Sequence, residues 1–295
     1  MAEELLILSR AVHFGSCLVL LSVFVVRLLV ERPVADDGRT ARRLAGACLA
    51  AAAGSGFLWF WAAVTGMSGS GLMDSLNPRL FRMVIEQTPP GHVWAVRSGV
   101  GVLLAGLLCF CRGGWRTGGI LAAVFAGSLA WLGHAGASEE GRRALTLAVD
   151  AAHLLSASTW PAGLLPFALL LKRQMETGAL AAAHAAARRF SAMSLAAVAV
   201  LAASGLVNAF FLVGGFHALA ATDYGRLLIV KLALFAIAAT LGAWNLLVHE
   251  PRLDSDPEAL GAMARKVWIE VALGMSIVLV VAILGTLAPA PRAPG

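Results

Sequence analysis

Charged residues are scarce in this chain: Asp, Glu, Lys and Arg make up 14% of its 295 residues. A soluble domain of this length would carry roughly a quarter. Hydrophobic residues make up 59%, and the mean hydropathy is +0.80. Because a soluble interior needs less apolar material, the composition predicts an integral membrane protein. Apolar runs of about 20 residues recur, which favours helices over a barrel, whose strands would alternate over about ten residues.

Cysteine is rare as well, with four residues in the chain. Disulfide frameworks belong to small secreted proteins, and no pair here has the setting of an extracellular disulfide. All four cysteines fall in or at the ends of apolar runs: Cys17, Cys48, Cys109 and Cys111. We therefore expect free thiols.

The N-terminus lacks the features of a cleavable signal peptide. Glu3 and Glu4 stand where such a peptide has basic residues, and the apolar run that follows reaches Val30 without a small-residue cleavage site. We expect a retained first span. Catalytic signatures are also missing, because the chain has no nucleophile elbow, no P-loop and no HExxH motif. The sequence therefore predicts a protein that is not an enzyme.

The apolar runs predict eight membrane-spanning helices that form one all-α bundle over residues 1–288. Their approximate ranges are 5–30, 43–66, 92–111, 117–136, 145–171, 190–213, 225–249 and 266–288. The Pro-rich tail 289–295 is expected to be disordered.

The loops hold the Lys and Arg residues that predict the orientation in the membrane. The odd-numbered loops contain thirteen and the even-numbered loops five, and cytoplasmic loops carry the excess. Both termini are therefore expected outside, in the periplasm of a Gram-negative cell. The net charge of +6 follows from these loops, and no segment resembles a nucleic-acid-binding module.

Three histidines are predicted to lie inside the membrane near its outer side. His13 is in the first helix, His134 near the end of the fourth and His153 early in the fifth. Ionisable groups at that depth are costly and mark functional sites by default, and imidazole suits copper. We predict that the three form a metal site at the mouth of the bundle. The alternative is that each ring forms a hydrogen bond to a neighbouring helix.

Two residues are predicted to support these histidines. Cys17 shares a helix face with His13, and its thiolate would favour Cu(I); the alternative is a small buried hydrophobe. Asp150 lies three residues before His153, so it could orient the imidazole or bind the metal itself. An ion pair of Asp150 with Arg97 or Arg10 is the alternative.

Softer candidates lie at both ends of the bundle. Thioether and imidazole groups near the long second loop could capture the ion, and they are Met67, Met73, Met83 and His92. Cys109 and Cys111 could form an exit site if the third helix ends there, as Gly113-Gly114 indicates. Ordinary membrane methionines, an interfacial histidine and buried cysteines are the alternatives.

Four polar residues in the last three helices are expected to face the bundle interior rather than lipid. They are Asn208, Lys231, Asn245 and Glu270. Lys231 lies nearer the outer side and Glu270 nearer the inner side, so the two are not expected to pair. These residues either line the path of the transported ion or form hydrogen bonds between helices.

The chain resembles the copper-resistance D family of inner-membrane proteins. The residues that carry the likeness are LLILSRAVHFGSCLVL, DAAHLLSASTWPAGLLPFALLL and, most specifically, the section Arg188–Leu287 with RRFSAMSLAAVAVLAASGLVNAFFLVGGFHAL, TDYGRLLIVKLALFAIAATLGAWN and IEVALGMSIVLVVAILGTLAP. The resemblance implies copper handling, usually uptake, beside or fused to a small periplasmic copper-binding β-sandwich protein. Since the chain has no such fused domain, a separate partner is expected.

The sequence therefore predicts a copper transporter that imports the ion from periplasm to cytoplasm through the histidine site. One alternative is a haem-binding membrane redox protein, because paired histidines on facing helices also suit b-type haem. A second is a copper-delivery factor that binds the metal without moving it across the membrane.

Overall fold

The computed structural model describes residues 2–31, 38–69, 71, 73–111, 113–133, 136, 138, 140–212, 216–256 and 258–287. These residues form helices and no strands. The α-helices are α1 (Ala2–Val25), α2 (Arg39–Ser68), α3 (Pro78–Gln87), α4 (Pro89–Phe110), α5 (Trp115–Gly127), α6 (Glu140–Thr159), α7 (Leu164–Glu176), α8 (Leu180–Leu212), α9 (Phe216–Ala221), α10 (Asp223–Trp244) and α11 (Ala259–Leu284). Short π or 3₁₀ segments follow or precede some of them: η1 (Val26–Glu31), η2 (Asp74–Leu76), η3 (Ser128–Leu132), η4 (Asn245–His249) and η5 (Glu250–Arg252).

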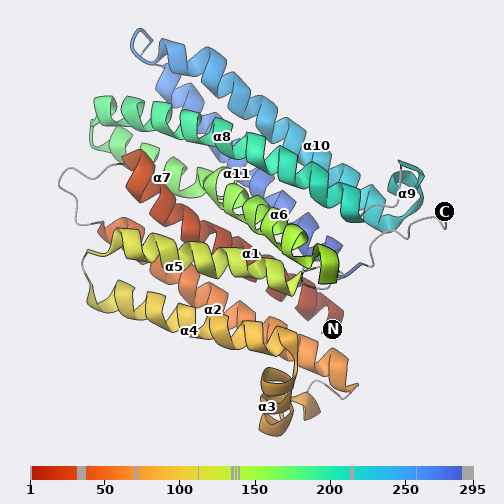
Figure 1. The fold of residues 1–295 in the computed structure, drawn as a ribbon. Coiled ribbons are helices and arrows are strands. Elements are labelled where there is room, and N and C mark those ends of the chain that lie inside the picture. The colour runs from red at the N-terminus through yellow and green to blue at the C-terminus, as the bar shows by residue number, and fades with distance from the viewer. Residues whose placement is uncertain are drawn as a thin grey trace.

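The long helices lie side by side in one bundle, with α8 and α10 at one edge and α4 at the other (Figure 1). The first helix, α1, lies between them and packs against α2, α5, α6 and α11. The short helices α3 and α9 lie at the same end of the bundle as the start of α1 (Figure 1).

The buried side chains form two main clusters. One joins α1, α2, α4 and α5, and the other joins α7, α8, α10 and α11. Helix α6 contributes to the first through Leu154, and Ala157 packs against both. The bundle therefore has an N-terminal and a C-terminal half, each with its own core.

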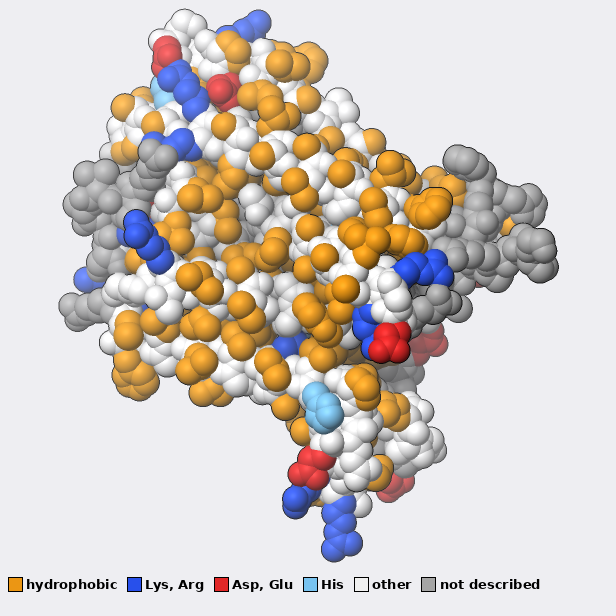
Figure 2. Space-filling view, in the orientation of Figure 1, with side chains coloured by type: hydrophobic (Ala, Val, Ile, Leu, Met, Phe, Trp, Pro, Cys, Tyr) orange, Lys and Arg blue, Asp and Glu red, His pale blue; other side chains and the backbone are white. Residues whose placement is uncertain are grey.

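The outer surface is that of a membrane protein. Figure 2 shows hydrophobic side chains over the middle of the visible face, with charged side chains mostly at the two ends of the bundle and on α3. Side chains such as Val102, Leu206 and Phe210 are more than two-thirds exposed. Outward apolar groups of this kind are stable against acyl chains and costly in water.

Seven helical segments among the described residues are long and apolar enough to span a membrane. They are Glu3–Glu31, Arg39–Ser68, Pro89–Phe110, Glu140–Glu176, Leu180–Leu212, Asp223–Arg252 and Ala259–Leu284. The expectation of a membrane-spanning all-α bundle is confirmed. The predicted fourth span, 117–136, corresponds to α5 and η3 and is not among these seven segments.

The predicted fifth span, 145–171, is not one continuous helix. It is divided into α6 and α7 by a turn that contains Pro161 and Gly163. Proline has no backbone N–H and disfavours an uninterrupted helix, so the break has a local cause. The predicted tail 289–295 lies outside the described residues.

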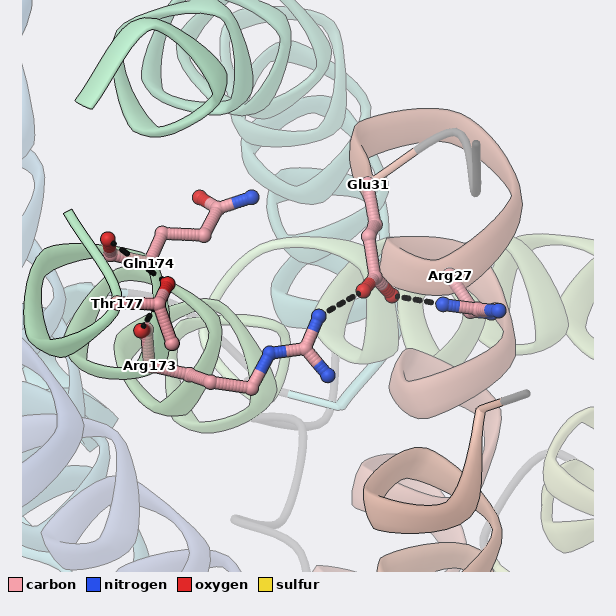
Figure 3. Close-up of polar contacts among 5 residues, drawn as sticks. All are labelled: Arg27, Glu31, Arg173, Gln174 and Thr177. Atoms are coloured by element: carbon pink, nitrogen blue, oxygen red, sulfur yellow. Dashed lines mark hydrogen bonds and ion pairs between the residues drawn. The ribbon is translucent and has the colours of Figure 1, made fainter. Parts of the chain in front are cut away.

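An ion-pair network joins η1, which continues α1, to α7 (Figure 3). It lies at the end of the bundle opposite α3 (Figure 1). The carboxylate of Glu31 lies 2.8 Å from Nη1 of Arg27 and 2.6 Å from Nη2 of Arg173. Arg27 is 2% exposed, whereas Arg173 is 38% exposed. The carboxylate of Glu31 therefore contacts a fully buried and a partly buried guanidinium and connects η1 to α7.

Glu31→Gln should destabilise the bundle, because it removes the charge that both guanidinium groups face. Loss of one partner of a buried pair costs about 3 kcal/mol at the low end of the usual range, and the partial exposure of Arg173 favours that end. The measurement is thermal unfolding of the purified protein in detergent. Glu176→Gln is the control, since Glu176 and Lys172 are both more than 60% exposed. Equal unfolding temperatures for the two variants would contradict the role given to Glu31.

Candidate functional site

His13 is buried in α1 and is hydrogen-bonded through both ring nitrogens. Its Nδ1 lies 2.9 Å from the carbonyl oxygen of Ala52 in α2, and its Nε2 lies 2.8 Å from Nη2 of Arg97 in α4. A guanidinium can only donate hydrogen bonds, so Nε2 must accept. The proton is therefore on Nδ1, which donates to Ala52, and the lone pair of Nε2 points at Arg97.

Aromatic rings and one glycine hold the His13 ring in place. Its centroid is 5.5 Å from that of Trp59 and 5.3 Å from that of Trp94. On the α2 side, Gly56 leaves room for the imidazole, because a Cβ at that position would lie 2.9 Å from Cε1 of His13. The ring therefore fits only because α2 has no side chain there.

Arg97 is 1% exposed and binds neutral groups on three other helical segments, α1, α5 and η3. Its Nη1 donates to the carbonyl oxygen of Phe125 and to Oγ of Ser128, both at 2.6 Å. Its Nη2 also lies 3.5 Å from Sγ of Cys17. Among the described residues no carboxylate forms an ion pair with Arg97, so its charge is stabilised by dipoles and by the Phe125 ring, 4.5 Å away.

Cys17 completes this cluster from α1. It has no exposed surface, and its Sγ lies 3.6 Å from Nε2 of His13. His13 and Cys17 share one helix face, as the spacing predicts, since both are buried and their side chains are in contact. A thiol and an imidazole at this separation could both bind one soft metal ion, but Arg97 contacts the ligand atom of each.

His153 belongs to a second polar cluster between α6, α8 and α10. Its Nδ1 lies 3.0 Å from Oγ of Ser204, and that hydroxyl donates its proton to the carbonyl oxygen of Val200 at 2.6 Å. Oγ therefore accepts from Nδ1, which leaves the lone pair of His153 on Nε2. Gly205 allows this close packing, since a Cβ there would lie 3.3 Å from Cε1 of the ring.

Asp150 lies one turn from His153 and has different partners. Its Oδ1 accepts a hydrogen bond from Nδ2 of Asn208 at 3.2 Å, and Lys231 of α10 lies within electrostatic range. The hydroxyl of Ser204, rather than Asp150, contacts Nδ1 of His153. Asp150 therefore places a carboxyl group near Lys231, and ionisable residues inside a membrane usually lie near such partners.

The predicted ligands are thus distributed over two clusters. His13 packs against α2, α4 and α5, and His153 packs against α8, without a common hydrogen-bond partner. His134 lies outside the described residues. Within the described part of the chain, no group of three or more His, Cys, Asp or Glu residues is close enough to hold a metal ion. The three-histidine site stays a prediction.

The softer candidates lie at the two ends of the bundle. Met67, Met73 and His92 are exposed near α3, with Nε2 of His92 donating to the carbonyl oxygen of Glu86. Cys109 and Cys111 are free and exposed at the opposite end. Helix α4 ends at Phe110, as the glycines after it predict.

Asn245 and Glu270 meet in the interior of the C-terminal half. Nδ2 of Asn245 donates to Oε1 of Glu270 at 2.7 Å, and both residues are at least 95% buried. Glu270 and Lys231 therefore have different partners, in agreement with the prediction that they do not pair.

Sequence reasoning considered Arg97 only as a partner for Asp150 and missed its contact with His13. The signal was present, because an arginine in the apolar run of α4 must bind something inside the bundle. The roles of Trp59, Trp94 and Gly56 carried no such signal, since tryptophans and small residues are common in membrane helices.

Gly56→Ala should disturb His13, because the added methyl group overlaps the imidazole. Overpacking of this kind costs about 1–3 kcal/mol and should lower the thermal unfolding temperature in detergent. Gly54→Ala is the matched control on the same helix, since a Cβ there meets nothing within 4 Å. If both variants unfold at the same temperature, the close packing of Gly56 on His13 is contradicted.

Two family models match this chain. The model for copper resistance protein D matches residues 184–284, and the model for the N-terminal domain of copper resistance protein D-like proteins matches residues 1–145. These ranges correspond approximately to the C-terminal and N-terminal halves of the bundle. No solved structure matches.

Three curated proteins are similar over most of the chain. Copper resistance protein D of Pseudomonas syringae pv. tomato is 31% identical over 222 residues, which cover 70% of this chain and 71% of that protein. Inner membrane protein YebZ of Escherichia coli is 31% identical over 76% of this chain and 77% of its own length. Copper transport protein CutJ of Bacillus subtilis is 30% identical over 77% of this chain, which spans only 42% of that relative. With both halves matched by the family models, this multi-pass membrane protein belongs to the copper resistance protein D family.

Proposed function

We propose that this protein transports copper across the bacterial inner membrane, from the periplasmic to the cytoplasmic side. The observation that carries the proposal is the buried His13–Cys17 pair, with its nitrogen and sulfur 3.6 Å apart. Imidazole and thiolate together favour Cu(I) over harder cations. Names that refer to copper resistance and copper transport among the relatives support the same ion.

Arg97 would control access to this pair. Its guanidinium lies 2.8 Å from the lone pair of His13, so a copper ion can bind Nε2 only after this hydrogen bond breaks. If Cys17 loses its proton when the metal binds, the thiolate becomes a charge partner for Arg97, which is already 3.5 Å away. The guanidinium would thus move from the imidazole towards the sulfur as copper enters.

The other predicted ligands would extend the route. His153 keeps the lone pair of Nε2 available through its hydrogen bond to Ser204, and His134 is proposed as a further copper ligand. Asp150 would keep Lys231 from repelling the ion. Met67, Met73 and His92 would capture copper at the mouth, and a small periplasmic β-sandwich protein would deliver it there.

The topology we propose is a single domain with eight crossings. Gly285, just after α11, lies beside Arg10 of α1, and Gly15 lies beside Val278. The start of α1 and the end of α11 lie at the same end of the bundle, and this placement supports an even number of crossings. Helix α5 and η3 supply the eighth, since 13 α-helical and five 3₁₀ residues span about 30 Å.

Native cysteines can test this topology. Cys109 and Cys111 are exposed at the end of the bundle that the excess of Lys and Arg assigns to the cytoplasm. A membrane-impermeant thiol reagent should label them only after spheroplasts are lysed. Ala221→Cys, at the end that holds α9, should be labelled in intact spheroplasts. Labelling of Cys109 in intact cells would contradict the orientation.

Transport can be tested with Cu(I) uptake into proteoliposomes and with copper binding to the purified protein. We expect uptake by the unmodified protein, and at least a tenfold loss of affinity in His13→Ala, Cys17→Ser and His153→Ala, because each removes a proposed ligand. His184→Ala is the control, since His184 lies at the opposite end of the bundle beside Asp254.

Three results would contradict the proposal. Unchanged copper affinity in His13→Ala, His134→Ala and His153→Ala would remove the proposed site. Copper binding without uptake would indicate a delivery factor. A Soret band of near-stoichiometric intensity in the purified protein would favour a haem-binding redox protein.

A further inference from the structure

A cavity of about 160 Å³ lies between α7, α8, α10 and α11, in the C-terminal half of the bundle. Its walls are mostly apolar, with the rings of Trp160, Phe167 and Phe190 among them. The volume has room for several water molecules. It is separate from the His13 cluster, whose residues do not line it.

Four buried polar side chains line this cavity: Ser191, Ser194, Asn245 and Glu270. The amide of Asn245 donates to Oε1 of Glu270. Oδ1 of Asn245 and Oγ of Ser194 have no hydrogen-bond partner among the described residues. A buried polar atom without a partner costs about 1–3 kcal/mol, so two of them beside one cavity indicate a bound species that supplies protons or positive charge.

The second carboxyl oxygen of Glu270 lies against α10 at Gly242. A Cβ at Gly242 would be 3.4 Å from Oε2, so the glycine lets the carboxyl group lie between α11 and α10. The position of Gly242 in the cavity wall keeps Oε2 next to the open space.

Glu270 has no charged partner in the described part of the chain. Of the sixteen residues that line the cavity, it is the one with an ionisable side chain. Lys266 lies one helical turn before Glu270 in α11, and His249 lies one turn after Asn245 in η4. Nζ of Lys266 is 2.8 Å from Nε2 of His249, so these two groups contact each other rather than Glu270. Lys231 of α10 lies near Asp150 and does not line the cavity, and the cavity residues of α7 and α8 are apolar or serine.

We propose that the Glu270 cavity binds a small hard cation, either a proton or Na⁺, at the oxygen atoms of Glu270, Asn245 and Ser194. All three donors are oxygens, which suit hard cations and not Cu(I). A carboxyl group inside a membrane without a cationic partner must take up a positive charge from elsewhere. Together with the proposed copper transport, this makes the cavity the site of the coupling ion.

The two ions can be distinguished on the purified protein in detergent without copper. For the proton, infrared difference spectra between acidic and basic buffer should contain a carboxylic-acid C=O band that disappears in Glu270→Gln. For Na⁺, replacing choline chloride with sodium chloride should raise the unfolding temperature of the unmodified protein and not that of Glu270→Gln. Glu258→Gln, an exposed carboxyl at the start of the same helix, should match the unmodified protein in both assays.

Ser194→Ala provides a second test if Glu270→Gln does not fold. It keeps the carboxyl group, so it should shift the C=O band or reduce the Na⁺-dependent stabilisation. Identical bands and no Na⁺ effect in all proteins would overturn the proposal. Because neither assay contains copper, these outcomes are independent of those for the His13 cluster.

Discussion

The proposed copper site depends on the hydrogen bonds that the guanidinium group of Arg97 donates to its buried neighbours. A permanent charge that is 99% buried in a membrane bundle must have its donors satisfied or it would destabilise the fold. Phe125, Ser128, His13 and Cys17 accept hydrogen bonds from its two Nη atoms, whereas Nε has no partner among the described residues. This single side chain therefore joins α4 to α1 and α5, selects the tautomer of His13 and occupies the atoms that a soft metal would bind. The contact of Arg97 with His13 and Cys17 therefore holds the helices together and also controls access of copper to the ligand atoms.

Each half of the bundle accommodates a histidine in its apolar interior in the same way, by packing the ring against a glycine of a neighbouring helix. In the N-terminal half, His13 packs against Gly56, and in the C-terminal half His153 packs against Gly205. In both, a neighbouring helix fixes the proton on Nδ1 and leaves the lone pair on Nε2. The halves differ in charge: among the described residues the hydrogen-bond acceptors of Arg97 are neutral, whereas the carboxyl group of Asp150 lies near Lys231. A cation inside the bundle would therefore meet the positive charge of Arg97 in one half. In the other half it would meet Lys231, which has the carboxyl group of Asp150 nearby.

Much of this arrangement could be predicted from the sequence. The apolar runs gave most helix positions, because a 20-residue apolar segment has few other stable structures in a membrane. Helical spacing placed His13 with Cys17, and the loop glycines marked the end of α4. The break at Pro161 was missed, since proline can also be accommodated within a membrane helix. Arg97 as the partner of His13 could not be derived, because spacing within one helix says nothing about which helices become neighbours. For the same reason, the cavity at Glu270 is visible only in the folded bundle.

The most direct test of the central claim is copper X-ray absorption of the Cu(I)-loaded protein. It is best done in a background of Cys48→Ser, Cys109→Ser and Cys111→Ser, so that Cys17 is the one remaining thiol. The account predicts a sulfur ligand and an imidazole ligand on the same copper ion. The sulfur signal should disappear in Cys17→Ser and the imidazole signal should weaken in His13→Ala. A copper environment that is unchanged by both substitutions would contradict it.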